Sequence, residues 1–249
     1  MSKLVRFSWV PLVIALAGCA SNGDERPDYA QERLPAAELY EQAQRAASRG
    51  EYTTALERLE TLQSQYPFED YAIQAQLDTI YVNFRAEEPD AVIASADRFI
   101  RLNPTHPRVD YAYYMRAWAN VLRGADLLSR VFPTDRSLRD PEPLRQAYAD
   151  FRRVVTEYPD SEYAEDAKLR MKRLREQLGQ HELAVARYYL DRGAYVAAAN
   201  RAKTLILDYQ DTALEDEAME ILAEAYDRLE LGDLRDEVRE VLQRGEASR

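Results

Sequence analysis

The amino-acid sequence predicts an all-α solenoid of about five helix pairs, which corresponds to ten helices. The first observation is composition, because Ala, Leu, Arg and Glu dominate and the 249 residues include only 8 Gly and 11 Pro, which favours helix over sheet. The second is a segment that occurs four times with apolar residues at helical spacing. The third is a proline that closes three of the four copies, at a point where a helix cannot continue.

Residues 1–18 have the pattern of a signal peptide. Lys3 and Arg6 supply the positive start of the pattern, and an apolar stretch from Val10 to Ala17 follows. That stretch is too short to cross a bilayer core of about 30 Å as a helix. We therefore interpret it as a leader that is removed from the mature chain.

The leader ends in Leu16, Ala17, Gly18 and Cys19, a pattern that resembles the lipobox of bacterial lipoproteins. The resemblance implies cleavage before Cys19 and covalent lipid on that residue, as N-palmitoyl and S-diacylglycerol groups, with no other cofactor. Several acyl chains, at roughly 0.8 kcal/mol per buried CH₂, hold a protein firmly in a membrane. Because Ala20 follows the cysteine where inner-membrane lipoproteins carry Asp, the resemblance implies the periplasmic face of the outer membrane. An ordinary signal peptide with a chance cysteine is the alternative.

Residues 19–34 are predicted to form the acylated N-terminus and a flexible tether. The stretch 20–34 is polar and lacks periodicity, and a coil of that length spans roughly 20 Å. The body of the chain is therefore expected to lie close to the membrane. We predict that the body consists of N-terminal repeats (35–160) and C-terminal repeats (161–249).

The four similar segments define the second helix of each of four predicted pairs. Their closing residues are Pro67, Pro104, Pro159 and Gln210. Small or apolar residues recur twelve, eight and five positions before each closing residue: Ala55, Val92, Ala147 and Ala198; Leu59, Ala96, Phe151 and Ala202; Leu62, Phe99, Val154 and Leu205. The pattern resembles the second helix of the tetratricopeptide repeat, in which a small residue allows two helices to approach closely.

Apolar spacing and turn residues predict the remaining helices. They are expected at 36–49, 70–85, 107–123 and 162–192, with a bend at Gly179, and in a final pair at about 213–230 and 233–245. Gly50 is expected to supply the turn of the first pair, and Asp140 to cap the helix that follows it. The insertion between residues 124 and 141 is longer than a repeat turn, and we interpret it as an ordered interaction loop, with disorder as the alternative.

Charge and residue chemistry argue against nucleic-acid binding and against catalysis. The formal net charge is −11, whereas phosphate contacts need a basic face. Cys19 is the only cysteine, and His106 and His181 are the only imidazoles. No Ser/His/Asp set and no phosphate-binding glycine loop can be assembled around them. We expect no enzyme, no metal site and no nucleic-acid partner; an envelope hydrolase is the least supported alternative.

Five stretches are more specific than a generic repeat: Tyr66-Pro67-Phe68, the run from Arg98 to Arg108, Asp110 to Arg116, 135–141, and Arg192-Gly193-Ala194. They resemble the BamD family, lipoproteins of the outer-membrane β-barrel assembly machinery. The resemblance implies a non-enzymatic scaffold that helps to recognise, fold and insert β-barrel proteins into the outer membrane. Gln210, where the family pattern suggests proline, puts one helix end in doubt.

The resemblance also implies partners. The N-terminal repeats would receive the terminal strand of an unfolded outer-membrane β-barrel protein. The C-terminal repeats would contact a BamA-like barrel subunit and BamC-like and BamE-like accessory lipoproteins. The alternative function is that of a repeat-containing pilotin-type lipoprotein in a pilus or secretin assembly system.

Two groups of residues are the predicted binding sites. The substrate-binding group comprises Tyr66, Phe68, Tyr71, Tyr81 and Phe84. We expect these aromatics to form a pocket for the terminal aromatic of an extended strand, with packing in the core as the alternative. The partner-binding group comprises Arg192 and Arg201. Arg201 precedes the packing position Ala202, so its side chain is expected to point outward; a surface arginine in an i, i+4 pair is the alternative.

Overall fold

The computed structural model describes residues 34–124, 140–210 and 212–247, and these ranges contain helices and no strand. The ten helices are α1 (Ala36–Ser48), α2 (Tyr52–Gln65), α3 (Asp70–Arg85), α4 (Pro89–Leu102), α5 (Val109–Gly124), α7 (Glu142–Glu157), α8 (Ala164–Asp191), α9 (Tyr195–Asp208), α10 (Glu215–Arg228) and α11 (Gly232–Ala247). Residues Pro35–Arg249 form one compact unit. No helix in these ranges is long and apolar enough to cross a membrane.

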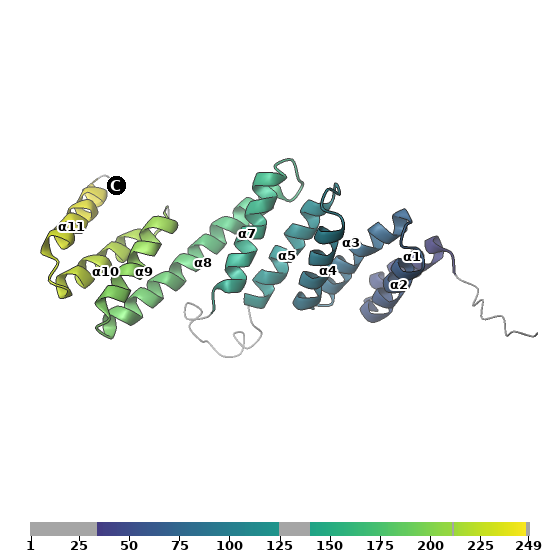
Figure 1. Cartoon of the computed structure of the whole chain (residues 1–249), viewed down its shortest axis with the longest axis horizontal. Coiled ribbons are helices and arrows are strands. Elements are labelled where there is room, and N and C mark those ends of the chain that lie inside the picture. The colour runs from purple at the N-terminus through teal and green to yellow at the C-terminus, as the bar shows by residue number, and fades with distance from the viewer. Residues whose placement is uncertain (1–33, 125–139, 211, 248–249) are drawn as a thin grey trace, which may run out of the picture. The chain divides into compact units, whose positions relative to one another are not determined.

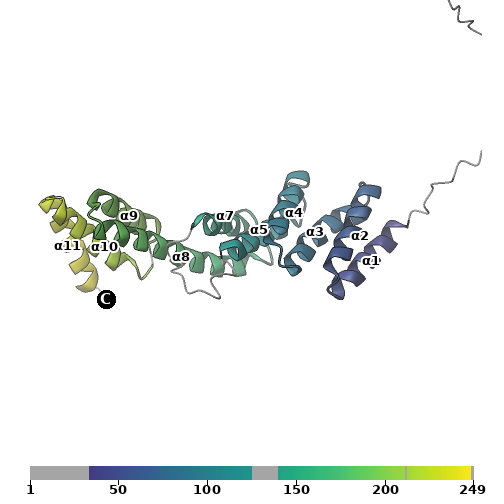
Figure 2. The ribbon, with the colours of Figure 1, turned by 90° about the horizontal axis from the view of Figure 1, so that it is seen from below.

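Within this unit, each helix packs against its neighbours in sequence (Figures 1 and 2). The pairs are α1/α2, α3/α4, α5/α7, α8/α9 and α10/α11. Weaker contacts join the first helices of successive pairs, such as α1 with α3 and α3 with α5. Stacking in which each pair contacts only its neighbours is the arrangement of a repeat solenoid. The predicted all-α fold of five helix pairs is therefore confirmed.

The twelve packing positions predicted from the repeat are all buried, and none is more than 1% exposed. Alanine at the first of these positions, as in Ala55 and Ala147, keeps the paired backbones close. Large residues fill the space nearer the helix end, as Phe99 and Phe151 do with no exposed surface. Burial of one such side chain contributes about 1.5–3 kcal/mol. The repeat pattern therefore marks the core of the solenoid.

The long helix α8 connects two hydrophobic clusters. Its N-terminal half contributes Ala167 and Leu174 to the first cluster, and its C-terminal half contributes Leu183 and Ala186 to the second. Gly179 lies between the two halves. A Cβ atom there would lie 3.1 Å from Leu214 Cδ1, so glycine allows the connection between α9 and α10 to pack against α8. The predicted boundary between N-terminal and C-terminal repeats after residue 160 stays a prediction. The boundary between the two hydrophobic clusters lies within α8.

Four of the pairs turn through a residue with positive φ: Gly50 (78°), Glu87 (58°), Gly193 (73°) and Glu230 (60°). In each turn, the next amide bonds to a carbonyl five residues earlier, as Glu51 N does to Ala46 O at 3.0 Å. This is the Schellman arrangement, which satisfies free carbonyls at the helix end. The predicted turn at Gly50 is confirmed, whereas the two glutamates adopt a conformation that disfavours an L side chain.

The second helices end in a common conformation, whether or not a proline follows. Tyr66, before Pro67, has φ −130° and ψ 53°, and Tyr209, before Gln210, has φ −121° and ψ 39°. Helix α9 therefore ends like the others, and the doubt raised by Gln210 is removed. The predicted N-cap is displaced by one residue: Pro141 is the N-cap of α7, and Asp140 lies just before it and accepts a hydrogen bond from the Glu142 amide at 3.0 Å.

Several predicted features lie outside the described residues. These are the signal peptide, Cys19, the tether up to residue 33, and residues 125–139 of the insertion. They remain predictions from the sequence.

The left-handed turns generate the first testable prediction. Glu87→Gly should raise the free energy of unfolding by about 0.5–1 kcal/mol, because relief of backbone strain exceeds the entropic cost of glycine. Gly50→Ala, where a Cβ would meet nothing within 4 Å, should lower it by about 1 kcal/mol. Urea unfolding followed by circular dichroism measures both. Equal destabilisation by the two substitutions would contradict this account of the turns.

Candidate protein-binding site

Eight aromatic side chains lie on α1, α3 and α5 or directly before α8, and ring contacts join several of them. We call this set the aromatic row: Tyr40, Tyr71, Tyr81, Phe84, Tyr111, Tyr114, Trp118 and Tyr163. The ring centroids of Phe84 and Trp118 lie 6.3 Å apart and join α3 to α5. Those of Tyr114 and Tyr163 lie 4.6 Å apart and join α5 to the residue before α8. Aromatic groups with polar tips are typical of protein interfaces.

Basic and acidic side chains flank the aromatic row. The Arg170 guanidinium carbon lies 3.6 Å from the centroid of the Trp118 ring, and Tyr114 donates a hydrogen bond to Asp166 at 2.6 Å. Burial alone would raise the pKa of Asp166. The hydrogen bonds from Arg170 and Tyr114 outweigh burial and lower this pKa, so the carboxylate stays charged at neutral pH. The row therefore combines stacking surfaces with fixed charges.

The five aromatics predicted to bind substrate lie at separate points. Phe68 is fully exposed between α2 and α3, whereas Tyr71 and Tyr81 are 40% and 44% exposed on α3. Ten residues of helix separate these two tyrosines by about 15 Å. Phe84 packs against the core, and Tyr66 caps the end of α2. Three cavities, lined in turn by residues of α2–α4, of α4, α5 and α7, and of α7 and α8 with the α9–α10 connection, contain none of these five aromatics.

The substrate-binding assignment of these aromatics stays a prediction. The structure arranges three of them, Tyr71, Tyr81 and Phe84, along the aromatic row instead of in one pocket. Sequence reasoning did not select the other members of the row. The apolar stripe on residues 107–123, which contains Tyr111, Tyr114 and Trp118, was the signal that pointed to them.

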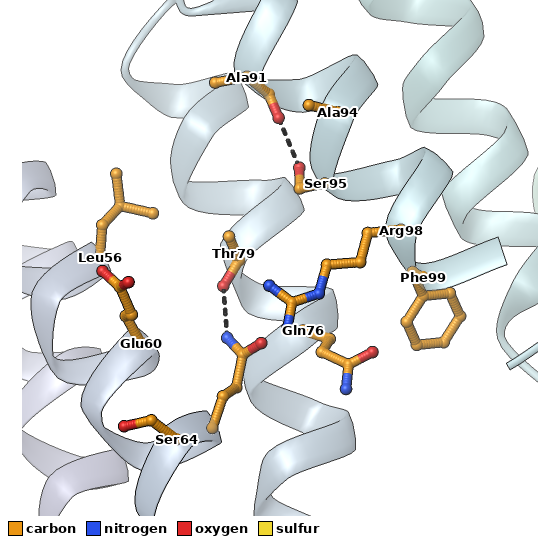
Figure 3. Close-up of a pocket in the computed structure, with 11 residues that line it drawn as sticks. Leu56, Glu60, Ser64, Gln76, Thr79, Ala91, Ala94, Ser95, Arg98 and Phe99 are labelled. Carbon is orange, nitrogen blue, oxygen red and sulfur yellow. Dashed lines mark hydrogen bonds between the residues drawn. The ribbon is translucent and has the colours of Figure 1, made fainter. Parts of the chain in front are cut away.

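A cavity of about 490 Å³ lies between α2, α3 and α4 (Figure 3). Most of its exposed lining surface is apolar, although seven of its eleven lining residues are of polar type: Glu60, Gln63, Ser64, Gln76, Thr79, Ser95 and Arg98. Gln63 donates a hydrogen bond to Thr79 Oγ1 at 3.2 Å, and Ser95 donates one to the Ala91 carbonyl at 2.7 Å. Arg98 extends from α4 toward Gln76 and Thr79 (Figure 3). This cavity was not predicted from the sequence.

In the next repeat, Arg116 of α5 connects the two flanking helices. Its guanidinium donates to Asp150 of α7 at 2.8 and 2.6 Å, and it also pairs with Asp97 of α4. Burial alone would lower the pKa of Arg116, but Asp150 and Asp97 outweigh burial and raise it. We call Arg116, Asp97 and Asp150 the arginine clamp.

A second clamp of opposite sign lies one repeat further along. Glu182 of α8 is only 1% exposed, and it accepts hydrogen bonds from Arg145 of α7 at 2.9 Å and from Arg201 of α9 at 3.0 Å. We call these residues the glutamate clamp. A buried carboxylate needs such partners, because its desolvation is costly.

The two arginines of the predicted partner-binding group have different surroundings. Arg201 is half-exposed, and Glu182 holds its guanidinium, so it neither extends freely outward nor pairs at i, i+4. Arg192 is exposed after α8, with its guanidinium carbon 4.3 Å from the centroid of the Tyr188 ring. The role of both residues in partner binding stays a prediction.

The glutamate clamp generates the second testable prediction. Arg145→Ala and Arg201→Ala should each lower the free energy of unfolding by about 1–2 kcal/mol, because the second arginine still compensates Glu182. In the double variant, the free energy of unfolding should fall by at least about 1 kcal/mol more than the sum of the two single losses, because the buried Glu182 carboxylate then has no cation beside it. Urea unfolding measures all three, with exposed Arg192→Ala as the control. Strict additivity would show that the two arginines act independently.

Comparisons with known proteins find relatives over most of the chain. The family model "YfiO: Outer membrane lipoprotein" matches residues 32–242. The outer membrane protein assembly factor BamD of Vibrio cholerae is 40% identical over 92% of this chain and 92% of its own length. BamD of Neisseria gonorrhoeae is 40% identical over 94% of this chain and 88% of its own length. Among solved structures, the crystal structure of MamA protein aligns with a TM-score of 0.39 and 14% identity, covering 85% of this chain and 92% of that chain. The chain therefore belongs to the BamD family of outer membrane lipoproteins, as its sequence motifs predicted.

Proposed function

We propose that this chain is a non-enzymatic scaffold of the β-barrel assembly machinery, which helps to fold and insert β-barrel proteins into the outer membrane. The similarity to the BamD proteins carries this proposal, because it extends over more than nine-tenths of the chain. Those relatives are named as assembly factors, which favours this function over the pilotin alternative. The exposed aromatics of the repeats supply a binding surface of the kind that such a role needs.

The proposed location is the periplasmic face of the outer membrane, with N-palmitoyl and S-diacylglycerol groups on Cys19. The family is described as an outer membrane lipoprotein, and the motif from Leu16 to Cys19 supplies the acylation signal. Several acyl chains would hold the chain at the bilayer without a spanning helix.

The N-terminal repeats are the proposed site for unfolded outer-membrane β-barrel proteins. An extended strand presents side chains to alternate faces, so one face could contact successive exposed aromatics. Tyr71 and Tyr81 supply two such contacts about 15 Å apart, and Phe68 supplies a third, fully exposed ring. These residues bind by stacking and apolar contact, which tolerates many substrate sequences.

The C-terminal repeats are the proposed site for machinery partners, namely a BamA-like barrel subunit and BamC-like and BamE-like lipoproteins. Arg192 is exposed beside Tyr188, and Arg201 keeps part of its guanidinium accessible while Glu182 holds it. A guanidinium that is already positioned loses less entropy when it binds a carboxylate.

The third testable prediction concerns the exposed tyrosines of α3. Tyr71→Ala together with Tyr81→Ala should weaken binding of an unfolded β-barrel protein about tenfold, because two partly exposed aromatic contacts are lost. Binding is measured by fluorescence anisotropy with a labelled β-barrel protein in urea-diluted buffer. Tyr188→Ala is the matched control, because Tyr188 is also 44% exposed but lies on α8. Equal weakening by the control would contradict the assignment of substrate binding to the N-terminal repeats.

The fourth testable prediction concerns the anchor. Cys19→Ala should release the chain from the outer-membrane fraction and lower the amounts of many β-barrel proteins together, because no acyl chain then holds the scaffold at the bilayer. Membrane fractionation and quantitative proteomics of the envelope measure both effects. Loss of a single pilus or secretin system would favour the pilotin alternative, and full retention in the membrane would refute acylation at Cys19 as the anchor.

A further inference from the structure

The cavity between α2, α3 and α4 and the arginine clamp occupy equivalent places in successive repeats. Thr79 and Arg116 lie 37 residues apart, which is also the spacing of the closing prolines Pro67 and Pro104. The same spacing relates Glu60, which lines the cavity, to Asp97 of the clamp. It also relates Asn83, one turn after Thr79 on α3, to Asn120, one turn after Arg116 on α5. Each side chain of the cavity can therefore be compared with its counterpart in the clamp.

At the clamp, the protein's own arginine fills the space between the helices. The remaining cavity there has about 260 Å³ and is lined by Asp97, Arg116, Asn120 and Asp150, among others. In the preceding repeat, Thr79 replaces the arginine, and Ser95 replaces Asp150, since both lie nine residues before the closing proline. The cavity there is larger, at about 490 Å³. The interface of α2, α3 and α4 thus lacks a counterpart of the Arg116 guanidinium, which lies in the interface of α4, α5 and α7.

The cavity retains groups that can accept hydrogen bonds from a guanidinium. Glu60 is the counterpart of Asp97, and no described residue lies within hydrogen-bond or ion-pair distance of its carboxylate. The Ser95 hydroxyl donates to backbone carbonyls, which leaves its oxygen available as an acceptor. Leu56 and Ala94 supply apolar surface for an aliphatic stem.

Arg98 places a positive charge in the same cavity. Its counterpart is Arg153, since both lie six residues before the closing proline. The guanidinium carbons of Arg153 and Arg116 lie 5.0 and 5.2 Å from the centroid of the Tyr113 ring. Both guanidinium groups therefore contact the Tyr113 ring, although Arg153 does not line the cavity beside Arg116.

We propose that the cavity between α2, α3 and α4 binds an arginine side chain of a polypeptide partner, whose guanidinium takes the place that Arg116 occupies in the next repeat. Glu60 accepts its hydrogen bonds from α2, and Ser95 accepts from α4. Arginine is preferred over lysine because its planar fork can bridge two acceptors on opposite walls. The site recognises this side chain whichever protein carries it, so it stands independently of the role in β-barrel assembly.

The direct test is a titration of the purified full-length chain, in detergent, with N-acetyl-arginine amide. Methyl NMR signals of Leu56, Ala91 and Ala94, which line the cavity, should shift and saturate at millimolar concentrations. N-acetyl-citrulline amide, which has nearly the same shape without the charge, should bind at least about tenfold more weakly. Tighter binding of N-acetyl-glutamate amide would overturn the proposal, because Arg98 would then be selecting a carboxylate.

Charge substitutions copied from the clamp sharpen this test. Ser95→Asp restores the counterpart of Asp150 and should tighten binding of the arginine probe about fivefold. Adding Thr79→Arg to Ser95→Asp places the protein's own guanidinium in the cavity and should abolish binding. Glu60→Gln should weaken binding about tenfold.

The matched control is Gln65→Asp, which adds the same charge on α2 but does not line the cavity. Thermal melting shows whether each variant is folded. The proposal is overturned if Ser95→Asp changes the affinity no more than Gln65→Asp does. It is equally overturned if Ser95→Asp shows no saturable shift up to about 50 mM probe, since one charge-assisted site of this kind gives millimolar affinity.

Discussion

Close apolar packing between paired helices is the constraint on which the rest of this structure depends. Each second helix presents a small residue and then larger apolar residues to its neighbours, and all of these positions are buried. Because each pair contacts only adjacent pairs, no single core holds the molecule together. The free energy of unfolding is instead a sum over similar interfaces. The first helices carry aromatic and charged groups on their remaining surface. The aromatic row is a consequence of this division of roles.

Polar interactions add a second level to these interfaces. The arginine clamp and the glutamate clamp each place one charge from a first helix between opposite charges from the two flanking second helices. Breaking one such pair leaves a buried charge without compensation, which is strongly destabilising. The interface of α2, α3 and α4 has a cavity in place of a clamp, and it lies in the half of the chain that is proposed to bind unfolded substrates. The proposed arginine site thus lies where an internal charge pair is missing.

Most of the fold could be predicted from the sequence, because helix pairs stacked in order are encoded by local periodicity. The exposed fraction of each aromatic could not, because it depends on rings from other helices, as the contact of Phe84 with Trp118 illustrates. The clamps were also missed, since Arg116 and Asp150 are 34 residues apart and no spacing rule connects them. Glu87 and Glu230 gave no sign of positive φ, because glutamate rarely adopts it.

The central claim is that stacked helix pairs present one surface, on their first helices, to unfolded β-barrel proteins. Hydrogen–deuterium exchange of the chain with and without an unfolded β-barrel protein tests this claim most directly. The account predicts slower exchange in α1, α3 and α5, which carry most of the aromatic row, and unchanged exchange in α10 and α11. Protection confined to α9, α10 and α11, or none anywhere in the repeats, would contradict it.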